Sequence, residues 1–212
     1  NIYGITEGGG GGLFNLYPED VLSRPGSIGK PTFGVEAKIV GPTGEELNHG
    51  EVGELIFRTS RMMREYYSNP EKTLEALKDG WLYTGDLLKT DKQGYFYIVD
   101  RMKDMVTSGG ENIFPVEIED ALMDHKDIDD IACIGYPDDR LVEIVLAVVQ
   151  VKEGRQLTEE EVIEFAKSKL SLYKVPRKVI FDQVPRNPTG KLMKPQLREK
   201  FTGRKEAFKK LD

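Results

Sequence analysis

The stretch Asp100–Glu119, DRMKDMVTSGGENIFPVEIE, decides how this chain is organised. It opens with four charged residues in five positions, namely Asp100, Arg101, Lys103 and Asp104. A glycine pair follows at Gly109-Gly110, and Pro115 is suited to open a helix. A strand end, a charged joint, a glycine turn and a helix start therefore follow one another directly. We expect a joint between two domains here, with ligand-binding groups on either side.

The sequence before this joint predicts a small antiparallel β-unit. Apolar and polar residues alternate along several short segments, as expected for half-buried strands. These segments are 35–40 (VEAKIV), 51–58 (EVGELIFR), and a hairpin of 81–90 and 95–100 around the turn 91–94. Asn69 as N-cap and Pro70 at the first helical position predict a short helix through Leu77. The glycine run Gly8–Gly12 should lie outside regular elements, because glycine loses the most backbone entropy on folding.

The sequence after the joint alternates helical and strand patterns. We expect helices at 115–123, 158–170 and 194–200, and strands at 129–137, 143–151 and 177–184. Thr158 and Glu161 fit a capping box at the start of the second helix. The order α-β-β-α-β-α is typical of a compact α+β domain. The predicted fold class is therefore α+β, with the domain boundary at Arg101–Asp104.

Composition narrows the possible functions. The chain has 212 residues and a formal net charge of −6, which argues against a general nucleic-acid binder. No apolar run has the length of a membrane span, and no signal peptide opens the chain, so we expect a cytoplasmic protein. Cys133 lies in an apolar run and should be a buried structural thiol, while His49 and His125 should be surface residues. Because the chain starts at Asn1 without a methionine, we expect a piece of a longer protein.

The segment Tyr3-Gly4-Ile5-Thr6-Glu7 combines four kinds of ligand-binding group. The ring can stack on a base, the glycine lets backbone approach a ligand, the hydroxyl can contact a phosphate, and the carboxylate can hold Mg²⁺. The alternative is a glycine-rich loop after a strand.

Two further residues near the joint could recognise a ribose. Asp86 follows Gly85 at a tight turn and could accept two hydrogen bonds from a diol, although a simple β-turn also explains it. Arg101 could reach the same ribose or a phosphate through its guanidinium, or form a surface ion pair with Asp100 or Asp104.

Two loops after the joint complete the set. Gly109-Gly110 would let a slender ligand pass close to bare backbone, or would form a hairpin turn. The loop 185–191, PRNPTGK, presents Lys191 between turn-forming residues. It lacks the residues of a Walker A loop. A lone exposed lysine is the alternative, but two prolines and a glycine indicate a fixed position.

In this order and spacing, these segments resemble the adenylate-forming superfamily of acyl-CoA synthetases, luciferases and peptide-synthetase adenylation domains. The resemblance covers essentially the whole chain and matches the carboxy-terminal part of such an enzyme. It implies that 1–101 is the β-rich end of the large AMP-binding domain and that 104–212 is the mobile lid domain. Lys103 falls at the hinge.

The resemblance also implies a role for each motif residue. The implied roles are adenine packing for Tyr3 and Gly4, a phosphate contact for Thr6, Mg²⁺ ligation for Glu7, ribose binding for Asp86 with help from Arg101, a pantetheine path beside Gly109 and Gly110, and a bridge from carboxylate to α-phosphate for Lys191. The implied substrates are a carboxylic acid, ATP and coenzyme A, with AMP as a product.

The form Ser108-Gly109-Gly110-Glu111-Asn112 is similar to that of fatty- and aryl-acyl-CoA synthetases. We therefore expect an acyl-CoA ligase of fatty acid metabolism. A peptide-synthetase adenylation domain, a luciferase-like enzyme and a non-catalytic module derived from such an enzyme are the alternatives. The family's phosphate-binding loop and most of its acyl pocket would lie upstream of Tyr3, so this chain alone should have negligible ligase activity.

Overall fold

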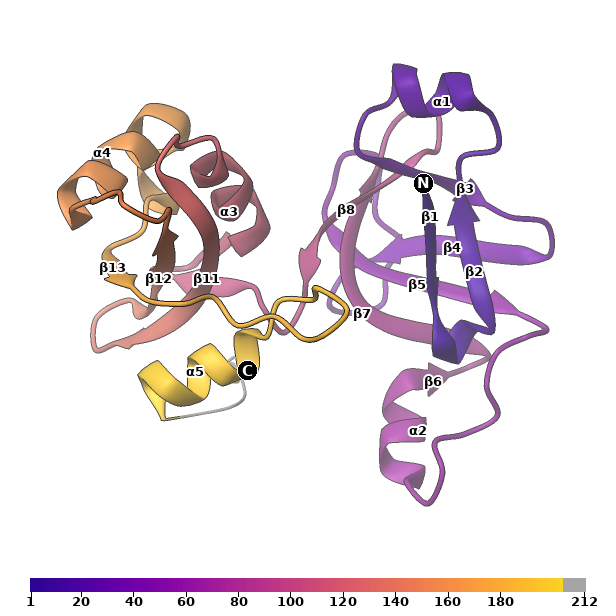
Figure 1. Cartoon of the computed structure of the whole chain (residues 1–212). Helices are drawn as coiled ribbons and strands as arrows, with labels where there is room; N and C mark the ends of the chain where they lie inside the picture. The colour runs from indigo at the N-terminus through magenta and orange to yellow at the C-terminus, as the bar shows by residue number, and fades with distance from the viewer. Residues whose placement is uncertain (204–212) are drawn as a thin grey trace. The chain divides into compact units, whose positions relative to one another are not determined.

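The computed structural model describes residues 1–203 and divides the chain into two compact units (Figure 1). The first unit is Asn1–Met102, and the second begins at Lys103. Within the described residues, no helix is long and apolar enough to cross a membrane.

The first unit is built on one eight-stranded sheet in which all paired strands are antiparallel. Its spatial order is β1-β2-β3-β8-β7-β5-β4, and β6 pairs with β7. The strands are β1 (Ile2–Ile5), β2 (Gly10–Phe14), β3 (Ser27–Pro31), β4 (Val35–Val40), β5 (Gly53–Thr59), β6 (Leu77–Lys78), β7 (Trp81–Thr90) and β8 (Phe96–Arg101). The predicted antiparallel β-unit is thus confirmed.

The apolar faces of these strands form a single core. Its fully buried members include Leu13, Leu55, Phe57, Leu82 and Leu88. The two short helices, α1 (Pro18–Ser23) and α2 (Pro70–Ala76), bury no residue in it. The predicted start of α2 is confirmed, since the Asn69 side chain accepts a hydrogen bond from the backbone N–H of Lys72.

The prediction for the glycine run was wrong in its second half. Gly10, Gly11 and Gly12 lie in β2, which pairs with β1, after a 3₁₀ turn at Thr6–Gly8. A Cβ built on Gly4 would lie 2.2 Å from the carbonyl oxygen of Gly10. The two backbones therefore approach too closely for larger side chains, and this close pairing outweighs the entropic cost of glycine.

The second unit has a five-stranded sheet with the order β10-β9-β12-β11, and β13 pairs in parallel with β12. The strands are β9 (Val106–Ser108), β10 (Glu111–Ile113), β11 (Ile128–Asp138), β12 (Val142–Val151) and β13 (Lys178–Phe181). The helices are α3 (Pro115–Met123), α4 (Glu159–Lys169) and α5 (Lys194–Thr202). A 3₁₀ turn at Leu172–Lys174 follows α4. The capping box of α4 is present, and the α+β prediction is confirmed.

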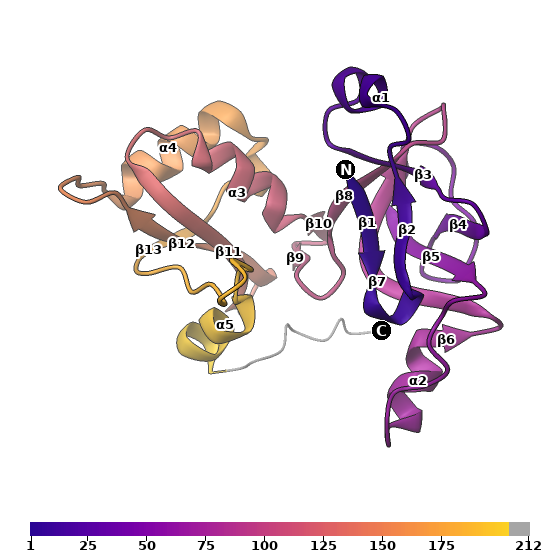
Figure 2. The same ribbon diagram turned by 45° about the vertical axis from the view of Figure 1, so that its right-hand side comes forward.

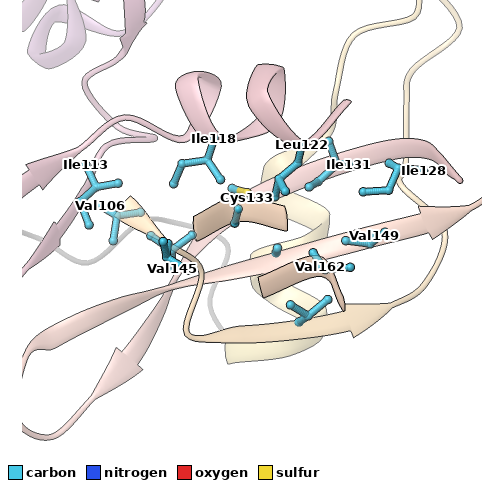
Figure 3. Packing of buried hydrophobic residues seen from close by; sticks show 14 residues of the cluster. Val106, Ile113, Ile118, Leu122, Ile128, Ile131, Cys133, Val145, Val149 and Val162 are labelled. Atoms are coloured by element: carbon cyan, nitrogen blue, oxygen red, sulfur yellow. The ribbon is translucent and has the colours of Figure 1, made fainter. Parts of the chain in front are cut away.

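Alternate residues of β11 and β12 point to opposite faces of this sheet and form two clusters. Helices α3 and α4 cover one face, where Ile118 and Leu122 pack with Cys133 and Val145 (Figure 3). Helix α5 covers the other face through Leu197. Cys133 is fully buried, as predicted. The loops that lead into these helices carry the candidate site residues of this unit.

Candidate functional site

Tyr3 on β1 and Asp86 on β7 meet inside the first unit. The phenolic oxygen of Tyr3 donates a hydrogen bond of 2.6 Å to Oδ2 of Asp86, across 83 positions of sequence. Both residues are buried, with 7% and 8% of their surface exposed. Burial, reinforced by the neighbouring Asp86, raises the pKa of Tyr3. The phenol therefore stays protonated and acts as a fixed donor to the carboxylate.

Arg101 joins this pair from the adjacent strand. Asp86 and Arg101 are register partners in the β7–β8 ladder, and Nε of Arg101 lies 3.4 Å from Oδ1 of Asp86. The alternative ion pairs of Arg101 with Asp100 or Asp104 are not among those of the described residues. Asp100 accepts a hydrogen bond from the backbone N–H of Arg101, and Asp104 pairs with Arg198. The strand register thus directs the guanidinium toward Asp86.

A bulge within β7 sets the direction of Asp86. Gly85 has a φ of +70°, which an L residue rarely adopts. Its N–H donates to Oε1 of Glu54 at 2.9 Å, and the hydroxyl of Thr84 donates to the carbonyl of Leu55. Burial raises the pKa of Glu54. The bulge is therefore held by side chains on both sides. The β-turn alternative for this segment was wrong, because β7 continues through it as one strand.

Glu7 lies in the 3₁₀ turn that links β1 to β2, and Tyr66 holds its side chain. The hydroxyl of Tyr66 donates to Oε1 of Glu7 at 2.8 Å, and the N–H of Met63 donates to the carbonyl of Glu7 at 2.7 Å. Burial and the contact with Glu7 raise the pKa of Tyr66 to about 12. The neighbouring Thr6 and Gly4 are exposed, so their polar groups are accessible to a ligand.

This arrangement fits a magnesium ion that is carried by a nucleotide. Among residues 1–203, no cluster of three or more His, Cys, Asp or Glu side chains could enclose a metal. Mg²⁺ is commonly held by one or two carboxylates together with substrate phosphates and water, rather than by an all-protein cage. A single carboxylate at Glu7 beside the Thr6 hydroxyl is a donor set of that kind.

The glycine pair forms a hairpin turn in the second unit. Gly109 and Gly110 connect β9 to β10 with φ values of +58° and +89°, which are the values of a type I′ turn. The turn alternative is therefore correct for the conformation. Both glycines are exposed, so the backbone at the tip remains open to a ligand.

The loop that carries Lys191 is ordered by one asparagine. Oδ1 of Asn187 accepts hydrogen bonds from the N–H groups of Thr189 and Lys191, at 3.1 and 2.8 Å, and from the Thr189 hydroxyl. The N–H of Asn187 donates to the carbonyl of Lys191 at 2.9 Å. The backbone of Lys191 is thus fixed by bonds within five consecutive residues.

An ion pair at the surface anchors the same loop to the sheet. Arg186 donates from Nε to Oδ2 of Asp130 at 2.6 Å and from a terminal nitrogen to the carbonyl of Gly190. The Lys191 side chain is exposed, and it forms no ion pair with any residue that the structure describes. The structure thus presents an unneutralised ammonium on a rigid backbone. Lys103, the predicted hinge, is also exposed.

The sequence did not point to three supporting residues. Tyr66 and Glu54 are distant in sequence from the groups they hold, and no local pattern links them. Asn187 could have been found, because an asparagine followed by proline, threonine and glycine is typical of a side-chain-stabilised turn. The structure brings Tyr3, Asp86 and Arg101 together, and Thr6 and Glu7 lie on one turn. The turn Gly109-Gly110 and the loop of Lys191 are two separate places in the second unit.

Two separate parts of the chain match two protein-family models. Residues 1–67 match the family described as AMP-binding enzyme, and residues 117–191 match the AMP-binding enzyme C-terminal domain. The chain is 41% identical over 201 residues to the long-chain-fatty-acid–CoA ligase FadD13 of Mycobacterium tuberculosis, covering 94% of this chain and 39% of that protein. It is 40% identical to a feruloyl-CoA synthase of Amycolatopsis, with 94% and 40% covered.

Solved structures agree with this assignment. ATP-bound MatB from Rhodopseudomonas palustris matches with a TM-score of 0.87 and 37% identity, covering 94% of this chain and 40% of that one. The o-succinylbenzoate-CoA synthetase of Bacillus subtilis, in complex with its acyl-adenylate, matches with a TM-score of 0.84 and 32% identity, covering 93% and 40%. The chain thus spans about two fifths of the length of its relatives. It belongs to the adenylate-forming, AMP-binding enzymes and corresponds to their carboxy-terminal part.

Proposed function

We propose that this chain supplies the carboxy-terminal part of an ATP-dependent acyl-CoA ligase. The ligase joins a carboxylic acid to ATP, giving acyl-AMP and pyrophosphate, and then transfers the acyl group to coenzyme A with release of AMP. The observation that carries the proposal is the Tyr3–Asp86–Arg101 cluster, in which side chains from three strands meet around one buried carboxylate. The similarity to named acyl-CoA ligases and to ATP-bound MatB supports it.

In this proposal the first unit binds the nucleotide. A carboxylate has about four lone-pair positions, so Asp86 can accept ribose hydroxyls while it receives the Tyr3 hydroxyl. Arg101 is close enough to Asp86 to orient the same carboxylate and to assist in ribose binding. The exposed backbone of Gly4 beside Tyr3 lets the adenine approach closely.

The triphosphate is placed at the neighbouring turn of the first unit. The Thr6 hydroxyl would contact a phosphate, and Glu7, oriented by Tyr66, would ligate Mg²⁺. The ion screens phosphate charge when it is bound.

In the first half-reaction, a carboxylate oxygen of the substrate forms a bond to the α-phosphorus, and the bond from that phosphorus to pyrophosphate breaks. Two anions must approach each other in this step, so a cation between them stabilises the developing charge. Lys191 supplies it, because its ammonium is exposed and forms no ion pair within the described residues. The Asn187 hydrogen bonds hold the backbone from which the ammonium extends.

In the second half-reaction, the thiol sulfur of coenzyme A attacks the acyl carbonyl, the thiol proton leaves to solvent, and the carbon–oxygen bond to AMP breaks. We assign the turn Gly109-Gly110 to the pantetheine path, since bare backbone leaves room for a slender chain. Residues 1–101 would be the end of the large domain and 104–212 the lid, with a hinge at Lys103. Domain rotation about a few residues is a common way to alternate two active arrangements.

The carboxylic acid is proposed only as a class. The named relatives include a long-chain-fatty-acid–CoA ligase and a feruloyl-CoA synthase, so fatty and aryl acids are both candidates. Since the chain spans about two fifths of these relatives, we propose that it has negligible ligase activity by itself. A cytoplasmic location and a place in fatty acid metabolism also remain proposals.

The test uses the longest protein that contains this chain, with ATP, Mg²⁺ and a panel of fatty and aryl acids. We expect acid-dependent exchange of pyrophosphate into ATP, and acyl-CoA formation when coenzyme A is added. In a parallel set of reactions, simple amines replace the thiol of coenzyme A. We include them because an amide bond synthetase from Marinactinospora thermotolerans matches this chain with a TM-score of 0.82. Amide formation without thioester formation would overturn the acyl-CoA assignment, and absence of acid-dependent exchange would overturn adenylation.

A further inference from the structure

Three consecutive residues at the start of β12 hold the glycine hairpin from one side. The carbonyl of Leu141 accepts a hydrogen bond from the N–H of Gly109 at 3.1 Å. Val142 is the ladder partner of Ser108. The side chain of Glu143 accepts a hydrogen bond from the N–H of Thr107, two residues before Gly109. The approach to the Gly109-Gly110 turn is thus fixed residue by residue.

The middle residue of these three is in a strained conformation. Val142 has a φ of +72°, a region that a β-branched residue rarely adopts. Strained positions persist where the surrounding contacts determine the backbone, and they concentrate at functional sites. Here the contacts on either side are the hydrogen bonds to Gly109 and Thr107. Val142 also directly follows the turn 139–141 between β11 and β12, where Asp138 accepts hydrogen bonds from the N–H groups of Arg140 and Leu141. The strained position therefore lies where this turn meets the contacts with the glycine hairpin.

Glu143 makes a contact that secondary structure does not require. Its Oε2 accepts a hydrogen bond from the N–H of Thr107 at 3.2 Å, although only 5% of the residue is exposed. Its other oxygen lies over Gly135 on β11, where a Cβ would be 2.4 Å from Oε1. Glycine at 135 thus leaves the space that the carboxylate occupies. A buried polar group is costly unless it is hydrogen-bonded, so the bond to the Thr107 amide is what compensates Oε2 for its burial.

The charged groups near this carboxylate come from two other elements. Arg198 on α5 lies close enough to lower the pKa of Glu143, but burial dominates and raises that pKa overall. The guanidinium of Arg198 is itself engaged by Asp104, with which it forms a buried ion pair. Glu143 forms no ion pair within residues 1–203, and the Thr107 amide donates a hydrogen bond to its carboxylate.

We infer that Glu143 is a positioning residue whose side-chain oxygen sets the backbone of Thr107, and through it the Gly109-Gly110 turn, for the acyl-transfer step. The function of the turn in that step rests on the function proposed above. The hydrogen bond that positions the turn does not depend on it. What matters in this inference is the reach of the acceptor and not its negative charge.

Two conservative variants separate reach from charge. Glu143→Asp keeps the charge but is one methylene shorter, whereas Glu143→Gln loses the charge and keeps an oxygen at the same distance. Amide hydrogen exchange of this chain is the first measurement. We expect Glu143→Asp to speed exchange at Thr107 and Gly109 about tenfold, in line with loss of one hydrogen bond. Glu143→Gln and the exposed control Glu160→Gln should match the wild type there.

The second measurement uses the longer ligase and supplied acyl-AMP. Glu143→Asp should lower kcat/KM for coenzyme A about tenfold and leave acid-dependent pyrophosphate exchange unchanged, while Glu143→Gln should match the wild type in both assays. Fast exchange spread evenly over residues 103–203, or a defect in Glu143→Gln that Glu143→Asp lacks, would overturn the inference. If the wild-type ligase makes no acyl-CoA, the proposed function fails, whereas the exchange result still decides whether Glu143 positions the hairpin.

Discussion

The Asp86 cluster of the first unit and the Lys191 loop of the second position a charge in opposite ways. Asp86 is buried and held by side chains from other strands, including a hydroxyl 83 residues away. Lys191 is exposed, and bonds from its own loop fix its backbone while its ammonium remains unpaired among the described residues. Figure 2 shows both regions on their elements, β1 and β7 in one unit and the loop before α5 in the other.

The difference predicts how each region responds to change. A buried, cross-strand carboxylate belongs to the folding core, so altering its partners should lower the stability of its unit. An exposed cation on a locally ordered loop contributes little to stability, so altering it should affect chemistry alone. A ligase that alternates between two reactions needs a nucleotide site that stays fixed. It also needs a cation that can move out of the site after the first reaction.

The largest effect is expected for Lys191→Ala in the longer ligase. Loss of the cation between two anions should slow acyl-AMP formation about 10²–10³-fold, while acyl transfer from supplied acyl-AMP should remain near the wild-type rate. Single-turnover assays of each half-reaction measure this, and Lys167→Ala, an exposed lysine on α4, is the control. Equal losses in both half-reactions would show that Lys191 does not act in adenylation alone.

Tyr3→Phe tests the buried side of the comparison. Removing the hydroxyl takes a hydrogen bond from a buried carboxylate, so the free energy of unfolding of the first unit should fall by about 2 kcal/mol. Trp81 on β7 is the only tryptophan, so its fluorescence during urea denaturation reports this unit. Tyr67→Phe, on a residue that is 96% exposed, should leave the midpoint unchanged. An unchanged midpoint in Tyr3→Phe would mean that the contact is not stabilising.

Asn187→Ala tests whether the order of the lysine loop matters. The variant loses the acceptor for the N–H groups of Thr189 and Lys191, so adenylation should slow about tenfold although Lys191 is intact. Asn187→Asp keeps an acceptor oxygen and should restore most of the rate. The Trp81 transition should not move in either variant. A wild-type rate in Asn187→Ala would indicate that the ammonium finds its position without the loop.

The smallest effect is a pH dependence in the first unit. Burial raises the pKa of Glu54 above its value in the unfolded chain, so the folded unit binds this proton more tightly. The neighbouring Asp86 adds to the shift and Lys78 opposes it. The wild type should therefore lose stability relative to Glu54→Gln as the pH rises through the raised pKa. Trp81-monitored denaturation of both proteins from pH 4 to pH 8 measures this loss. A wild type that gains stability relative to Glu54→Gln as the pH rises would contradict the prediction.

Local patterns predicted more of the fold than of the contacts. The N-cap at Asn69, the capping box at Thr158 and the buried Cys133 depend on neighbours along the chain or on an apolar run, and each is confirmed. The glycine strand at 10–12 was missed because its pairing depends on the close approach of Gly4, which no propensity records. Tyr66 and Glu143 were missed for a related reason, since their partners are selected by the packing of separate elements.

The amino-acid sequence by itself determined the α+β class, most of the elements and the motifs that mark an adenylate-forming enzyme. These features depend on periodicity and on turn and cap residues that act over a few positions. Only the tertiary structure decided which side chains meet, such as Tyr3 with Asp86 or Glu143 with Thr107. The physical reason is that strand register is set by the whole buried face of a sheet, and one register brings together residues that are far apart in sequence.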